Sequence, residues 1–96
     1  MSLFSKIKTS LRISNTAFDE EIQDLIDAAK ADMVLVGIIS SKIVDTDSLI
    51  IRAITVYCKA NFGWDNPDAE KLQRSYEMLR NHLSQSIDYA VEEGES

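Results

Sequence analysis

Apolar side chains recur with the spacing of an α-helix along almost the whole chain, and this pattern constrains the fold most strongly. Residues 3–11, 17–36 and 67–90 each place their apolar side chains on one helical face, whereas residues 48–62 are apolar on nearly every side. The connector of residues 38–46 is apolar enough for a strand, but no second segment offers it a partner. The sequence therefore predicts an all-α fold, a compact cluster of about four helices with a long C-terminal helix.

Capping residues mark where three of these helices are expected to begin. Thr16 and Asp19 have the spacing of a capping box at the start of the second helix. Asp47 is the expected N-cap of the third helix. Asn66 followed by Pro67 predicts that the fourth helix begins at residue 67.

Gly37 and Gly63 are expected to stop the second and third helices. The fourth helix, if it runs unbroken over residues 67–90, is about 36 Å long at 1.5 Å per residue. A compact chain of this size is only about 32 Å across, so the last turns are expected to project from it.

The predicted core faces consist of Phe18, Ile22, Leu25, Ile26, Ala29, Met33 and Val36 in the second helix, and of Ala69, Leu72, Tyr76, Leu79, Leu83, Ile87 and Ala90 in the fourth. The third helix is predicted to lie at the centre of the bundle because so much of its surface is apolar.

The length and composition of the chain predict a single domain. Its 96 residues, 45% hydrophobic and 27% charged, suit one modest core. We expect one helical domain over residues 1–91 and a frayed acidic tail over residues 92–96, because glutamates lie at the negative end of the last helix dipole. The longest apolar run, Met33 to Ile39, is far short of the roughly 20 residues that span a bilayer, so no membrane contact is expected.

The sequence offers little for catalysis, cofactor binding or metal binding. The single cysteine, Cys58, excludes an intramolecular disulfide and a multi-cysteine zinc site, which indicates a reducing cytoplasm. His82 is the single histidine, and a pair with Cys58 is disfavoured because Cys58 lies on the apolar third helix. The three glycines lie far apart, so there is no phosphate-binding loop. We therefore predict that the protein is not an enzyme and has no catalytic, cofactor-binding or metal-binding residues.

Charge argues against broad binding of nucleic acids. The net charge of −6 repels phosphate backbones. The local exception is the segment of residues 1–15, which carries Lys6, Lys8 and Arg12 and no acid. Solvated charges on a short helix are the favoured interpretation of this segment, and a nucleic-acid contact is the weaker alternative.

Two helical faces outside the core are candidates for contacts with other subunits or proteins. On the second helix Glu20, Asp24 and Asp27 form an acidic face opposite the core residues. This face is either simply solvated or a contact for cations of a neighbouring subunit, such as Arg52, Lys59 or the basic first helix.

The second candidate is the outer face of the last helix, which comprises Ser75, Met78, His82, Gln85 and Tyr89. Methionine and tyrosine are enriched at protein contacts, although scattered apolar side chains are also common on surfaces. Trp64, between the third and fourth helices, is expected to cover the end of the core rather than to anchor a partner.

Three groups of segments, read in order, resemble a known protein family. They are Leu11–Ile13, Thr16–Ile22 and Leu25–Lys30, then Asp47–Ile54 with Tyr57–Gly63, and last Asn66–Glu70 with Tyr76, Glu77 and Leu79. Together they resemble the small head–tail connector proteins of tailed bacteriophages and prophages, also called DNA-packaging adaptors. The resemblance extends over about residues 6–89.

This resemblance implies a structural role in the virion. Such proteins form a ring of about a dozen identical subunits beneath the portal protein, extend the DNA channel after packaging, and receive the next connector or tail protein. DNA would then be non-specific cargo, and the ring would assemble in the bacterial cytoplasm and stay at the head–tail junction. In such a ring the acidic face of Glu20, Asp24 and Asp27 is a candidate for a channel wall that repels DNA. The alternatives are a small helical regulatory or DNA-binding module of a prophage and, less favoured, an enzyme subunit.

Overall fold

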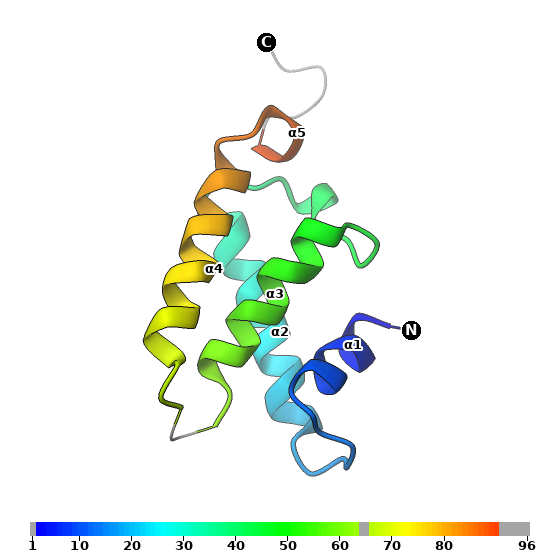
Figure 1. The fold of residues 1–96 in the computed structure, drawn as a ribbon. Helices are drawn as coiled ribbons and strands as arrows, with labels where there is room; N and C mark the ends of the chain where they lie inside the picture. The colour runs from blue at the N-terminus through cyan, green and yellow to red at the C-terminus, as the bar shows by residue number, and fades with distance from the viewer. Residues whose placement is uncertain (1, 64–65, 91–96) are drawn as a thin grey trace.

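The computed structural model describes residues 2–63 and 66–90, and every regular element in these ranges is helical (Figure 1). The elements are α1 (Leu3–Ser10), α2 (Asp19–Leu35), the 3₁₀ turn η1 (Ser40–Lys42), α3 (Ser48–Asn61), α4 (Ala69–Ser84) and α5 (Ile87–Ala90). The predicted all-α fold is therefore confirmed. Trp64 and the predicted tail at residues 92–96 lie outside the described ranges.

Helix α3 lies at the centre of the bundle, as predicted from its apolar sequence. It packs against α4 on one side, against α2 behind it and against α1 (Figure 1). Its buried side chains are Ile50, Ala53, Ile54, Val56, Cys58 and Ala60. They meet a core face of α2 formed by Ile22, Ile26, Ala29 and Met33. Helices α2 and α3 run in opposite directions (Figure 1).

The predicted stop of α2 and the predicted start of α3 are both confirmed. Gly37 has φ +103°, and the amide of Ile38 donates to the carbonyl of Met33 (3.1 Å), which is the hydrogen bond of a glycine-terminated helix. Asp47 Oδ1 accepts hydrogen bonds from the amides of Leu49 (2.9 Å) and Ile50 (3.1 Å). Between these two ends, the connector packs down at Ile38, which is buried.

The predicted capping box at Thr16 and Asp19 is wrong. No side chain caps α2; instead the Asp19 amide bonds to the Thr16 carbonyl, and Asn15 Oδ1 accepts from the Ala17 amide. The Asp19 carboxylate is used elsewhere, in an ion pair with Lys8 of α1 at 2.7 Å. The turn before α2 thus brings two helices together instead of capping one. It also leaves Phe18, a predicted core residue, 43% exposed.

Asn66 organises a turn before α4 instead of capping it directly. Its Oδ1 accepts from the Asp68 amide (3.0 Å) and its Nδ2 donates to the Lys59 carbonyl (2.7 Å). The helix begins at Ala69, so Pro67 lies in the turn and not in the first helical position. The asparagine therefore joins the end of α3 to the start of α4.

The single long helix predicted over residues 67–90 is also wrong. Helix α4 ends at Ser84, and α5 follows as a separate turn over Ile87–Ala90. The physical cause is a competing set of hydrogen bonds: Ser86 Oγ accepts from the Asp88 amide, and the Tyr89 carbonyl accepts from the amide of Ile39 (2.8 Å). The chain therefore turns back onto the connector. Ile87, a predicted core residue, is left 76% exposed.

Candidate interaction surfaces

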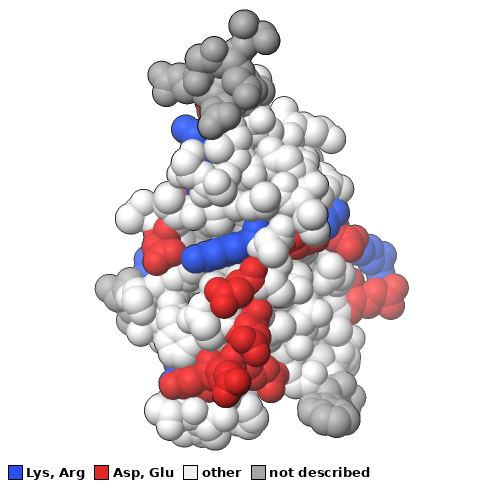
Figure 2. All heavy atoms as spheres, turned by 180° about the vertical axis from the view of Figure 1, so that it is seen from behind, with Lys and Arg blue, Asp and Glu red and all other residues white. Residues whose placement is uncertain are grey.

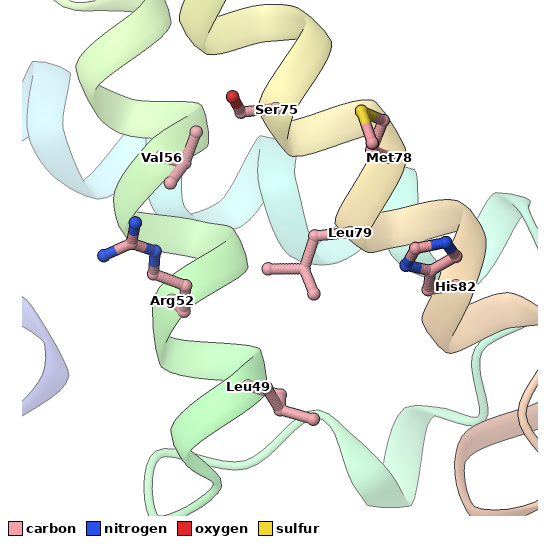
Figure 3. A pocket seen from close by; sticks show the side chains of 7 residues that line it. All are labelled: Leu49, Arg52, Val56, Ser75, Met78, Leu79 and His82. Carbon is pink, nitrogen blue, oxygen red and sulfur yellow. The ribbon is translucent and has the colours of Figure 1, made fainter.

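A shallow groove separates α3 from α4 on the face shown in Figure 3. Its volume is about 370 Å³, and its lining residues are Leu49, Arg52 and Val56 from α3 and Ser75, Met78, Leu79 and His82 from α4. We call this feature the α3/α4 groove. It forms because the two helices pack side by side while short or flexible side chains line the seam between them. Helix α2 passes behind both helices in the same view.

The α3/α4 groove has apolar walls with a cation on its rim. Leu49 and Met78 are both strongly exposed, Met78 to 64%. Arg52 forms no ion pair with any residue in the described ranges. A surface that combines open apolar walls and an unneutralised guanidinium suits a partner with an apolar side chain next to a carboxylate.

This groove unites residues that the sequence placed in two separate candidate faces. Arg52 belongs to the predicted cationic strip of α3, whereas Met78 and His82 belong to the predicted outer face of α4. Lys59 is exposed on α3 beyond the groove. Tyr89 does not join them, because α5 turns away: its ring is half-buried and its hydroxyl donates to Asp47 Oδ2 at 2.9 Å.

The acidic face of α2 is exposed on the opposite side of the molecule. Figure 2 shows acidic side chains gathered on the rear, where α2 lies. Glu20, Asp24 and Asp27 are all exposed, and the carboxylate of Asp27 accepts a hydrogen bond from Gln23 (3.0 Å). Farther along the same side of the helix the exposed residues become apolar. We call the whole side the outer face of α2, and it consists of Glu20, Asp24, Asp27, Ala31, Val34 and Leu35.

A polar network between α2 and α4 escaped the sequence analysis. The hydroxyl of Tyr76, a fully buried residue, donates to Asp32 Oδ2 at 2.6 Å, and Arg80 donates to the same oxygen at 2.9 Å. Burial of the Asp32 carboxylate opposes its charge, but the two hydrogen bonds and the charge of Arg80 outweigh this effect and lower the pKa of Asp32. The sequence did contain a signal for this network: Tyr76 belongs to a predicted core face, and a buried tyrosine hydroxyl needs a hydrogen-bond partner.

The structure places the candidate nucleophile out of reach of reaction partners. Cys58 is fully buried, and this burial raises the pKa of its thiol to about 12, so the thiol is protonated at neutral pH. In residues 2–63 and 66–90, no three side chains of the types that bind metals lie close enough together to hold an ion. None of the helices in the same ranges has the length and apolar character needed to cross a membrane.

Comparison with models of protein families gives a match over almost the whole chain. Residues 3–90 match the family described as phage connector protein, a range that extends from the first residue of α1 to the last residue of α5. Comparisons with curated proteins and with solved structures returned no match.

Proposed function

Because this chain belongs to the phage connector protein family, we propose that it forms a ring-shaped adaptor between the portal and the tail of a phage particle. A phage connector family is a structural family and not an enzyme family, and its members associate with other proteins of the phage head or tail. In the proposed role, about a dozen copies close into a ring that matches the symmetry of the portal. The ring then extends the channel through which DNA passes.

The observation that best supports a ring is the pair of different exposed surfaces on opposite sides of the molecule. A ring of identical subunits needs head-to-tail contacts, in which one surface of each copy meets a different surface of the next. The α3/α4 groove and the outer face of α2 are two such surfaces (Figures 1 and 2). A two-fold dimer would require only one self-complementary surface.

The charge of the protein favours DNA as cargo over DNA as a binding target. A net charge of −6 repels the phosphate backbone, which helps a duplex slide through a channel. The basic N-terminal segment is also weaker as a DNA site than its sequence indicates. Lys8 is paired with Asp19 and donates to the carbonyl of Asn15, so this cation is already neutralised. These contacts disfavour the alternative of a small DNA-binding module.

Native mass spectrometry and electron microscopy test the proposal directly. The purified protein is measured alone and after mixing with DNA-filled phage heads that carry a portal but no tail. We expect closed rings in one or both preparations, with new density at the portal vertex. A protein that remains monomeric in solution and adds nothing to the vertex would contradict the proposed function. A gel shift on duplex DNA that weakens with salt would favour the DNA-binding alternative instead.

A further inference from the structure

The outer face of α2 has the residue spacing of a helix that packs into a groove. Its positions 20, 24, 27, 31 and 34 alternate steps of four and three residues, which keeps them on one line along the helix. The first three are acidic, and the line ends in Val34 with Leu35 beside it. Leu35 is 83% exposed and Val34 is 47% exposed. An exposed apolar pair at the end of an acidic line needs a partner that offers both an apolar surface and cations.

The rim of the α3/α4 groove has the matching arrangement. On α3, Leu49, Arg52, Val56 and Lys59 follow one another in steps of three, four and three residues. This row alternates apolar residues with cations, from Leu49 at the start of α3 to Lys59 near its end. Across the groove, Met78 of α4 lies near Val56, whereas Leu49 lies at the other end of the groove (Figure 3). Leu49 and Lys59 are ten residues apart and Leu35 and Asp24 are eleven apart, so each span is about 15 Å along its helix and an apolar contact and an ion pair can form at its two ends together.

We propose that the α3/α4 groove of one copy receives the outer face of α2 from the next copy. This inference rests on the proposed function, because it supplies the contact between ring subunits. Val34 and Leu35 of the entering helix lie against Leu49 at the start of α3. Its acidic positions extend along α3 toward the two cations, with Asp24 near Lys59 and Asp27 between Lys59 and Arg52.

The direction of the entering helix is set by the symmetry of a ring. Within one chain α2 runs opposite to α3 (Figure 1). A neighbour related by the small rotation of a many-membered ring, about an axis along the helices, keeps nearly the same orientation. Its α2 therefore also runs opposite to the α3 that it contacts. This direction puts the apolar end of α2 at the start of α3 and the acidic end at Lys59, which is the match that the charges require.

Cysteine cross-linking tests which surfaces meet. Leu35→Cys and Leu49→Cys variants are prepared singly and together and are treated with a short bis-maleimide under conditions that give rings, in solution or on portal-bearing heads. We expect no product from either single variant, a dimer from their mixture, and a ladder of oligomers from the double variant. The unaltered chain is the control for Cys58, which is buried. A dimer from a single variant would overturn the proposal, since it requires a two-fold contact.

Charge reversal tests the pairing of α2 with α3. Arg52→Glu and Asp27→Lys are each expected to raise the protein concentration needed for assembly at least tenfold, and the double variant to recover most of this loss. Lys42→Glu, in η1 and not among the residues of either surface, is the matched control with no expected effect. Rings that form normally in both single variants would overturn the interface and leave the proposed function standing. Normal rings that lose packaged DNA would instead place the acidic face on the channel wall.

Discussion

At the scale of single residues, Asp32 shows how one carboxylate joins two helices that do not pack closely. Its Oδ2 accepts both the Tyr76 hydroxyl and the Arg80 guanidinium, so a buried phenol and a partly exposed cation share one acceptor. The phenol ring also packs edge-on against Tyr57 of α3. Without the carboxylate, the Tyr76 hydroxyl would lie in the core with no partner, and that is costly.

We predict that Asp32→Ala lowers the free energy of unfolding by about 2 kcal/mol, because it removes a charged acceptor and leaves a buried donor unsatisfied. Tyr76→Phe is expected to lower the free energy of unfolding by only about 1 kcal/mol, because it removes the buried hydroxyl together with its hydrogen bond and leaves no unsatisfied donor. Urea unfolding of both variants and of their combination measures these effects. If the two losses simply add, the hydrogen bond between the residues contributes nothing to stability.

Asp32 also predicts a pH dependence of stability. Its pKa in the folded protein lies below the ordinary value of 3.8, so its charged form is stabilised by folding. The contribution is therefore fully present above pH 3.8 and is lost as the pH falls through the lower pKa of the folded state. The stability difference between the unaltered protein and Asp32→Asn should shrink with acid below pH 3.8. A difference that stays constant from pH 6 to pH 2.5 would contradict this linkage.

Arg12 occupies a backbone conformation that suits glycine. Its φ is +61°, and the amide of Ile13 donates to the Lys8 carbonyl (3.0 Å) where α1 ends. A side chain in this region costs about 1 kcal/mol. We predict that Arg12→Gly raises the free energy of unfolding by about 0.5 kcal/mol, net of the added freedom of the unfolded chain. Arg12→Ala, which removes the charge but keeps the strain, should not stabilise the protein in the same thermal and urea experiments.

At the scale of elements, helical periodicity predicted which segments form helices better than it predicted where each helix begins and ends. Asp47 starts α3 and Gly37 ends α2 through hydrogen bonds between residues close to them in the chain, so both roles can be predicted from sequence. The break after Ser84 depends on the bond between Ile39 and Tyr89, fifty residues apart along the chain, which no local pattern reveals. The apolar spacing continues through Ile87, and periodicity alone therefore extends the helix across the break.

The same reasoning explains what was missed at the candidate site. Each of Arg52, Met78 and His82 was correctly placed on an outward side of its helix. That they form one groove depends on α3 and α4 being neighbours, which is a tertiary fact. Asp32 was overlooked because an acid near the end of a helix is usually solvated, and its two partners lie more than forty residues away.

Few contacts hold helix α5 against the rest of the protein, so the loss of one hydrogen bond should lower its local stability measurably. Tyr89→Phe removes the hydrogen bond to Asp47 Oδ2, while Asp47 keeps its capping bonds through Oδ1. We predict a loss of about 1 kcal/mol in the local stability of α5, with little change in global unfolding. Hydrogen exchange at the Ile39 amide, which donates to the Tyr89 carbonyl, reports this directly and should become several-fold faster. Equal exchange in both proteins would mean that the hydroxyl does not hold α5 in place.

At the scale of the whole molecule, the proposed subunit contact combines an apolar end with a charged end. The salt dependence of association should distinguish the contributions of the two ends. Raising the salt from 0.05 to 0.5 M screens exposed ion pairs, so the dissociation constant between copies should increase about fivefold, corresponding to two pairs of about 0.5 kcal/mol each. Asp24→Asn combined with Asp27→Asn should abolish that dependence. Leu35→Ala should weaken association about tenfold at every salt concentration and leave the slope unchanged, because burial of apolar surface is not screened. Analytical ultracentrifugation across the salt series distinguishes the variants. A slope that survives in the asparagine variant would mean that the acids of α2 do not face the cations of α3.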